Sequence, residues 1–313
     1  MKTIPLKIKE QLKKVIVGKD DTVELLIAAV LAGGHVLLED TPGTGKTTLA
    51  LALTKCMGLR FRRIQMTPDT TASDITGYSA YDTGKGEFVY HEGAAMTDLL
   101  LADELNRTSG RTQAALLEAM EERRLTVDGV THELSPYFTV IATQNPVGTA
   151  GTSAIPLSQL DRFMVRLRLG APDRDSLKKI LTDRAHADPL ESAEQVCTAE
   201  ELGTLKAEID KVAVKEEVTD YLCDLMQAAS ESSYTDGGIS PRGALALFRL
   251  AKAGAFLDGR DHVVPKDIRT CLIPVCAHRL VLTREARAAG KTPEGILEEI
   301  KKDIPYPENK EDL

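Results

Sequence analysis

The sequence of 313 residues contains no tryptophan and only six phenylalanines, and aromatic residues make up 4% of it. Surfaces that stack nucleic-acid bases on aromatic side chains therefore have little material here. Basic residues are not in excess either, because 39 Lys and Arg stand against 47 Asp and Glu, a formal net charge of −8. Since binding to a phosphate backbone needs a basic face, we expect no nucleic-acid partner.

Long apolar runs and paired cysteines are also missing. No run approaches the ~20 apolar residues of a membrane-spanning helix, so we expect no transmembrane segment. The first five residues lack the apolar stretch of a signal peptide. The five cysteines are odd in number and form no Cys-x-x-Cys pair. These absences together predict a cytoplasmic protein whose cysteines are free, buried thiols.

What the chain does have is a phosphate-loop pattern. An apolar run at 36–38 predicts a buried strand, and a helical pattern at 49–57 follows. Between them the chain reads Glu39-Asp40-Thr41-Pro42-Gly43-Thr44-Gly45-Lys46-Thr47-Thr48. Strand, glycine-bearing loop, Gly-Lys-Thr and helix is the context that a nucleotide phosphate loop requires. The usual pattern begins with glycine where this chain has Asp40, which weakens the bare motif.

The chemistry of this loop suits a nucleoside triphosphate. Gly43 and Gly45 have no Cβ, so backbone N–H groups can turn toward phosphate oxygens. The helix N-terminus adds further donors and a positive dipole end. Lys46 can reach the β and γ phosphates, and the Thr47 hydroxyl suits Mg²⁺. We expect the loop residues from Thr41 to Thr48 to bind the nucleotide.

Two further strands are predicted to end in polar side chains. The apolar run 99–102 leads into Asp103 and Glu104, and the run 138–143 leads to Asn145. Because ligands bind at the carboxyl ends of parallel strands, we expect these side chains to meet the phosphate loop. Asp103 would then hold Mg²⁺, Glu104 would orient the attacking water, and Asn145 would hold that water against the γ-phosphate.

Two candidate sites lie outside the strands. Val17-Gly18 precedes the phosphate loop, and an adenine ring could pack on Ile16 and Val17; an ordinary apolar turn explains the same residues equally well. Arg242 is predicted in the first turn of its helix, where the helix dipole disfavours a cation. Contact with phosphate would explain its position, and a solvated surface arginine is the alternative.

Two insertions are predicted to be hairpins. Residues 67–91 are rich in Gly, Thr and Asp and contain aromatic residues on both sides of a glycine-bearing turn at 84–86. Residues 125–134 alternate around Asp128-Gly129, a strong signal for a two-residue turn. Within this second hairpin we expect His132 to be a solvated strand residue.

The composition changes after residue 173. Helical patterns and their caps are predicted at about 174–186, 199–213, 216–230, 241–258, 265–284 and 293–303, with no convincing strand. A further helix is predicted at 106–124 in the first part. We therefore expect an α/β core of residues 1–173, a parallel-sheet P-loop fold, followed by an all-α lid domain of residues 174–313.

Taken together, these residues resemble the MoxR group of AAA+ ATPases. The similarity runs from Val17-Gly18 to about residue 305, and in this group an acidic residue replaces the first loop glycine. The most specific stretches are Asp103-Glu104-Leu105-Asn106-Arg107, Gln113-Ala114-Ala115-Leu116-Leu117-Glu118-Ala119-Met120, Ala142-Thr143-Gln144-Asn145-Pro146, Leu160-Asp161-Arg162-Phe163 and Ser240-Pro241-Arg242.

The resemblance implies a role for each site residue. It assigns the Walker A motif to the loop of Lys46 and Thr47, and the Walker B motif to Asp103 and Glu104. It implies sensor 1 for Asn145 and sensor 2 for Arg242. Arg162 resembles the arginine finger that acts on the ATP of a neighbouring subunit. Arg107 and Arg111 are further candidates for an interface, and the sequence does not decide which of the three arginines acts in trans.

The resemblance also implies a function. It points to an ATP hydrolase that requires Mg²⁺, assembles into a ring, most often a hexamer, and does chaperone-like remodelling or maturation of a client. Partners with a von Willebrand factor A domain are typical of the group. A chelatase-type ATPase subunit for metal insertion and a nucleic-acid-remodelling AAA+ motor remain as alternatives.

Overall fold

The computed structural model describes residues 3–40, 43–145, 152–184 and 188–305. A five-stranded sheet forms its centre, and all of its strand pairs are parallel. In spatial order the strands are β2 (Phe61–Gln65), β5 (Leu99–Asp103), β8 (Thr139–Gln144), β1 (Val36–Glu39) and β9 (Val165–Leu167). Because the strands are parallel, their carboxyl ends lie on one edge and their amino ends on the other. We call these the carboxyl edge and the amino edge.

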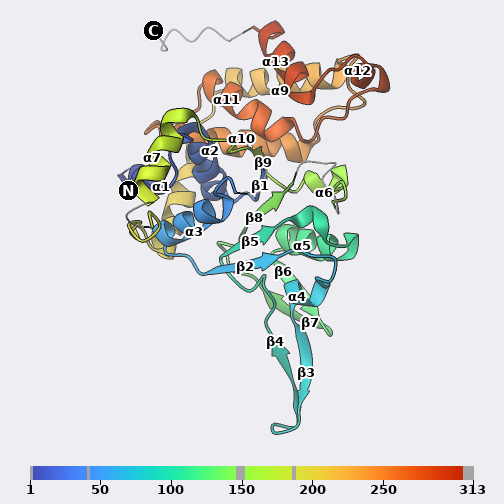
Figure 1. Cartoon of the computed structure of the whole chain (residues 1–313). Coiled ribbons are helices and arrows are strands. Elements are labelled where there is room, and N and C mark those ends of the chain that lie inside the picture. Colours follow the sequence, from blue (N-terminus) through green and yellow to red (C-terminus); the bar gives the residue numbers. More distant parts are fainter. Residues whose placement is uncertain (1–2, 41–42, 146–151, 185–187, 306–313) are drawn as a thin grey trace.

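Helices cover both faces of this sheet (Figure 1). Alternate strand residues point to opposite faces, so Leu38 and Leu101 pack into one apolar cluster while Leu37 and Leu100 pack into another. The first cluster includes residues of α1 (Thr3–Val15), α2 (Asp20–Leu31) and α3 (Lys46–Met57), and the second includes residues of α5 (Gly110–Glu122). Burial on both faces explains why β5 and β8 are continuous buried runs.

Both predicted hairpins are present. The first, β3 (Tyr78–Asp82) and β4 (Glu87–His91), follows the short helix α4 (Ala72–Thr76) and extends away from the core in Figure 1. The second is β6 (Arg124–Val127) and β7 (Val130–Glu133). Its turn has positive φ at Asp128 (50°) and Gly129 (80°), as a two-residue turn of this kind requires.

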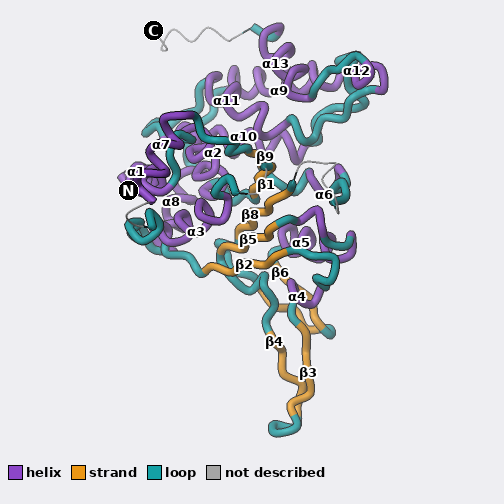
Figure 2. Tube along the Cα trace, viewed as in Figure 1, coloured by secondary structure: helices purple, strands orange, loops and turns teal. Residues whose placement is uncertain are grey.

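From residue 174 onward the described elements are helices (Figure 2). They are α7 (Arg174–Arg184), α8 (Ala199–Asp210), α9 (Glu216–Glu231), α10 (Pro241–Leu257), α11 (Pro265–Cys276), α12 (Arg284–Ala288) and α13 (Pro293–Asp303). A short helix, α6 (Leu157–Leu160), and a 3-10 turn, η1 (Leu105–Arg107), complete the core.

Several details differ from the sequence predictions. The helix predicted at 265–284 ends at Cys276, two residues after Pro274, and a separate short helix begins at Arg284. The helix predicted at 106–124 begins only at Gly110, because the Ser109 side chain accepts a hydrogen bond from the backbone N–H of Thr112 and caps it there.

Two side-chain predictions were confirmed only in part. Four cysteines are buried as expected, but Cys223 is exposed on α9. His132 is half-buried because its ring stacks on Tyr90 of the other hairpin, with centroids 3.8 Å apart.

Candidate active site

The phosphate loop lies between β1 and α3, at the carboxyl edge of the sheet, with β8 and β9 on either side of β1. Gly43 and Gly45 have φ of 87° and 90°, a conformation that favours glycine. No atom lies within 4 Å of where a Cβ of Gly43 would be, so the loop backbone is open to a ligand there. Thr41 and Pro42 lie outside the described residues, while Thr44, Thr47 and Thr48 are half-buried at the end of the loop and the start of α3.

Lys46 points back along the loop. Its Nζ donates to the carbonyl oxygen of Asp40 at 2.6 Å, and the residue is only 9% exposed. Burial lowers the pKa of Lys46, and the negative charges of Asp40, Asp103 and Glu104 oppose that shift. A buried ammonium group facing three carboxylates is suited to neutralising phosphate oxygens.

The structure gives Asp40 a role that the loop pattern did not predict. Its carboxylate accepts hydrogen bonds from the backbone N–H of Leu169 at 2.5 Å and of Gly170 at 3.0 Å. These bonds tie the start of the phosphate loop to the chain that leaves β9. A glycine at position 40 would have no side chain with which to make them.

Asp103 and Glu104 lie at the carboxyl end of β5, as predicted, and β8 separates this strand from β1. Thr143 of β8 donates to Asp103 Oδ1 at 3.2 Å and accepts from the backbone N–H of Glu104 at 2.8 Å. Arg63 of β2 donates from Nε to Asp103 Oδ2 at 2.6 Å. Glu104 has φ of 58°, in the left-handed region. Residues other than glycine rarely adopt this conformation, and those that do are often found at functional sites.

Three side chains hold the carboxylate of Glu104. Asn145 donates to Oε1 at 3.1 Å, and Gln65 and Arg107 donate to Oε2 at 2.9 and 2.8 Å. Burial tends to raise the pKa of Glu104, but the hydrogen bonds from Arg107 and Asn145 and the nearby positive charges leave its pKa below the usual value. An ionised carboxylate in a fixed position can orient and polarise a water molecule.

Asn145 is itself fixed. Its backbone carbonyl oxygen accepts from Asn106 Nδ2 at 3.0 Å, and its backbone N–H donates to Asn106 Oδ1 at 3.3 Å. Asn106 is 1% exposed and Asn145 is 5% exposed. This reciprocal pair aims the Asn145 side chain at Glu104.

The Val17-Gly18 segment adjoins the phosphate loop. A Cβ on Gly45 would lie 4.0 Å from Cδ1 of Ile16, so the two segments are neighbours. Gly18 has φ of 71° and lines a surface pocket of about 440 Å³ together with Leu169, the residue that Asp40 anchors. The residues that line this pocket do not include Ile16 or Val17, on which an adenine ring was expected to pack.

Arg162 and Arg242 lie elsewhere. Both pair with Glu121 at the end of α5: Arg162 donates from Nε to Oε2 at 2.7 Å, and Arg242 donates from Nη2 to Oε1. The two guanidinium groups hold the pKa of Glu121 below its usual value, the hydrogen bond from Arg162 being the main cause. We call these three residues the arginine pair and its carboxylate.

The arginine pair belongs to the amino edge. Next to Glu121, the carbonyl oxygen of Met120 lies 3.1 Å from Nε2 of His35, the residue before β1, and Met164 donates to the His35 carbonyl oxygen at 2.8 Å. Lys46 contacts Asp40, which follows β1. At about 3.3 Å per residue, positions 35 and 40 are about 16 Å apart along the strand.

The remaining candidate arginines differ in position. Arg107 contacts Glu104 of its own chain, and Arg111 is exposed in the first turn of α5. Sequence reasoning missed Gln65, Arg63 and Glu121. No local pattern marks them, because their roles depend on β2 lying beside β5 and on α5 ending near the start of β1.

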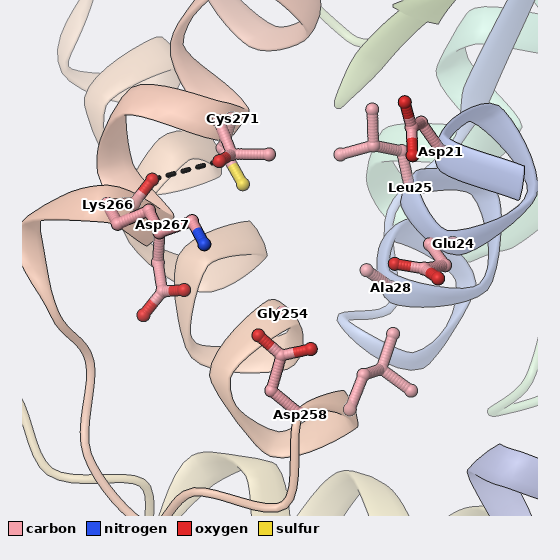
Figure 3. Close-up of a pocket in the computed structure, with 11 residues that line it drawn as sticks. Asp21, Glu24, Leu25, Ala28, Gly254, Asp258, Lys266, Asp267 and Cys271 are labelled. Carbon is pink, nitrogen blue, oxygen red and sulfur yellow. Dashed lines mark hydrogen bonds between the residues drawn. The ribbon is translucent and has the colours of Figure 1, made fainter.

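A separate pocket of about 140 Å³ lies between α2 and the helices α10 and α11. In Figure 3, Asp21 and Glu24 of α2 face Asp258, Lys266 and Asp267 across it. Asp267 is paired with Arg260 at 2.6 Å. The residues that line this pocket include none of the predicted site residues, so we do not assign the pocket to the candidate site.

Among the described residues, no helix combines the length and the apolar composition that crossing a membrane requires.

Known proteins share the fold of a parallel-sheet core followed by a helical lid. The model of the ATPase family associated with various cellular activities (AAA) matches residues 35–165, and the AAA lid domain model matches residues 227–300. A crystal structure of a protein from Cytophaga hutchinsonii assigned as an ATPase superposes with a TM-score of 0.90 and 34% identity, covering 98% of this chain and 96% of that one.

Two curated relatives extend over nearly the whole chain. Uncharacterized protein YeaC of Bacillus subtilis (strain 168) is 43% identical over 298 residues, covering 95% of this chain and 93% of the relative. Chaperone MoxR1 of Mycobacterium tuberculosis is 33% identical over 307 residues, covering 95% and 81%. The parallel-sheet core with its helical lid, the phosphate loop and these relatives agree, and the chain belongs to the MoxR family of AAA+ ATPases, enzymes that hydrolyse ATP.

Proposed function

We propose that this ATPase works as a ring in which each protomer completes its neighbour's active site, and that hydrolysis drives chaperone-like remodelling or maturation of a partner protein. One observation carries the proposal. Lys46, Asp103, Glu104 and Asn145 meet at the carboxyl edge of the sheet, whereas Arg162 and Arg242 are held at the amino edge. The two halves of one catalytic site therefore face different sides of the protomer.

In the proposed mechanism the carboxyl edge binds the triphosphate. The loop N–H groups and Lys46 hold its phosphates, and Gly18 lies beside the base. Thr47 and Asp103 would supply oxygen ligands for Mg²⁺, and the ion would neutralise charge on the phosphates. Glu104 orients the water that attacks the γ-phosphorus in line, and the Asn145 amide helps to position it. ATP and water give ADP and phosphate.

The amino edge supplies the missing positive charge. Phosphoryl transfer is accelerated by a guanidinium group that stabilises charge on the transferred phosphoryl group. Arg162 and Arg242 pair with Glu121, whose neighbour Met120 contacts position 35, and position 35 is about 16 Å along the strand from position 40 at the start of the phosphate loop. We therefore propose that both arginines reach the ATP of the next protomer. Head-to-tail contacts of this kind close into a ring, of which a hexamer is the form we expect.

The last part of the proposal concerns the boundary between core and lid and the kind of client. We place the boundary between core (1–173) and lid (174–313) where Asp173 accepts a hydrogen bond from the Ser176 N–H at 2.8 Å, at the start of α7. The client is a protein, as the name of the relative Chaperone MoxR1 suggests, and a partner with a von Willebrand factor A domain is one candidate.

The substitution Arg162→Ala tests the trans arrangement. We expect ATP hydrolysis to fall by about 10³-fold, while titration with ATP shows nearly unchanged affinity, because the phosphate loop is intact. In the wild type, turnover per protomer should rise as protein concentration drives assembly. Monomers that hydrolyse ATP as fast as assembled protein would rule the trans role out.

A further inference from the structure

Arg279 of the lid is a buried arginine that binds one turn of the core. It follows α11, and its side chain is 3% exposed. Its Nε donates to Asp161 Oδ1 at 2.8 Å, and its Nη2 donates to the carbonyl oxygens of Asp161 at 2.9 Å and Phe163 at 2.7 Å. Its Nη1 donates to the Met164 carbonyl oxygen at 3.3 Å. One guanidinium group thus satisfies four acceptors of residues 161–164, here called the finger turn.

Other lid residues bind the same turn. Ser240, the N-cap of α10, donates from Oγ to the Asp161 carboxylate at 3.2 Å. His278 Nε2 lies 3.1 Å from the Phe163 carbonyl oxygen. A Cβ on Gly243 would lie 2.8 Å from Cδ of Arg279, so only the lack of a side chain there allows α10 to pack so closely on this arginine.

This contact includes both members of the arginine pair. Arg162 lies inside the finger turn, next to Asp161. Arg242 lies in the first turn of α10, two residues after Ser240, and its Nη1 is 3.9 Å from Asp161 Oδ2. Arg162 and Arg242 both pair with Glu121. Arg279 therefore connects the two segments that carry the pair without being exposed itself.

We propose that Arg279 is a positioning residue for catalysis in trans: by fixing the finger turn to the lid, it places Arg162 and Arg242 as one unit toward the neighbouring protomer's nucleotide. This inference rests on the trans arrangement proposed above. It adds a consequence, namely that the arginine pair moves with the lid. A rotation of the lid in one protomer then alters the active site of the next.

The geometry sets the expected effect of Arg279→Lys. Lysine keeps the positive charge near Asp161, but an ammonium group is a point charge and cannot serve four acceptors spread over a fork. The finger turn should lose its fixed position. Because a misplacement of about 1 Å can cost about 10²-fold in rate, we expect assembled Arg279→Lys protein to hydrolyse ATP about 10²-fold more slowly, with unchanged ATP affinity.

A mixing experiment separates positioning in trans from damage within the chain. Arg279→Lys protomers keep their own Lys46 and Glu104 but offer a misplaced arginine pair. Glu104→Gln protomers lack the carboxylate but offer an intact pair. Neither alone should be active. At random equimolar mixing about one interface in four joins the two intact halves, so activity should recover to about a quarter of the wild-type rate.

Two controls accompany the mixture. Arg162→Ala mixed with Glu104→Gln should recover in the same way, since it removes the finger itself. Arg269→Lys is the matched control, because Arg269 is another lid arginine that donates to carbonyl oxygens. Its acceptors are the carbonyl oxygens of Lys301 at 2.8 Å and Ile304 at 3.1 Å, which are far along the chain from the finger turn. It should keep wild-type turnover.

The outcomes are distinguishable. Recovery with both Arg162→Ala and Arg279→Lys supports the inference. Recovery with Arg162→Ala alone overturns it and leaves the proposed function standing. Recovery with neither overturns both. If Arg279→Lys is misfolded, as failure to bind ATP would show, Ser240→Ala replaces it. Loss of the hydroxyl that donates to Asp161 should lower turnover less than Arg279→Lys does, and turnover should recover when this variant is mixed with Glu104→Gln. Its failure to recover would overturn the inference.

Discussion

At the scale of single residues, Glu104 shows how a functional side chain is fixed. Its backbone adopts the left-handed conformation, which costs a residue with a side chain about 1–3 kcal/mol. That conformation turns the carboxylate toward Asn145, Gln65 and Arg107, each from a different segment. The strain is maintained because these donors, and Thr143 on the backbone N–H, determine the position from several directions.

His35 is a buried residue whose ionisation should affect stability. Val140 donates its N–H to Nδ1 at 2.9 Å, so Nδ1 must be unprotonated, and Nε2 faces the Met120 carbonyl oxygen at 3.1 Å. Burial lowers the pKa of His35 from 6.5 to about 4. The unfolded chain therefore binds a proton at higher pH than the folded chain does. Stability from the neutral ring is complete above pH 6.5 and is lost as pH falls toward 4.

We expect this residue to contribute about 2 kcal/mol to the loss of unfolding free energy between about pH 7.5 and about pH 5. Denaturant unfolding at both pH values measures it. In His35→Asn the amide oxygen can still accept from Val140, but nothing titrates, so the variant should be less stable at the higher pH and lose less on acidification. His278 is also buried with a lowered pKa, and its contribution is shared by both proteins. Equal losses in the two would contradict the prediction.

At the scale of elements, the two hairpins are linked. Tyr90 of β4 stacks on His132 of β7, and its hydroxyl donates to the Thr76 carbonyl oxygen at 2.6 Å. Farther out, Tyr81 and Phe88 meet edge to face at 5.4 Å and are 56% and 73% exposed. The base of the first hairpin is thus packed on the second hairpin, while its outer part carries aromatic side chains into solvent.

The outer part can be removed without the base. Replacing residues 81–88 by Asn-Gly joins Ala80 and Val89, which face each other in register, through a two-residue turn. We expect ATP turnover within about twofold of wild type and an unchanged melting temperature, since surface changes away from packed features are usually small. Remodelling of a client should be lost. A large fall in turnover of the assembled protein would show that this segment serves the ATPase itself.

Sequence reasoning succeeded where local order decides the outcome. The phosphate loop, the carboxylates at the end of β5 and the Asp128-Gly129 turn each follow from a few consecutive residues. It failed where distant segments meet. His278 and Arg279 lie in the stretch that was predicted as helix by continuing α11 past Cys276. Nothing near them in the sequence indicates the finger turn. Likewise, Gln65 reaches Glu104 only because β2 pairs with β5.

At the scale of the whole molecule, the central feature is the separation of charges between the two edges of one sheet. At the carboxyl edge Lys46 lies near the carboxylates of Asp40, Asp103 and Glu104, and Arg63 and Arg107 are held by the last two. At the amino edge two guanidinium groups pair with one carboxylate. Under the proposed mechanism, neither edge of a single protomer has every group that phosphoryl transfer needs. Contact between the amino edge of one copy and the carboxyl edge of the next would unite them.

The most direct test is a cryo-EM or crystal structure of the Glu104→Gln variant with ATP and Mg²⁺, because this substitution should slow hydrolysis and leave binding intact. We expect the triphosphate on the phosphate loop beside Lys46 and Asp103, with Arg162 and Arg242 of the adjacent protomer at the γ-phosphate. A nucleotide bound elsewhere, or a γ-phosphate contacted by Arg162 of the same chain, would contradict the shared site.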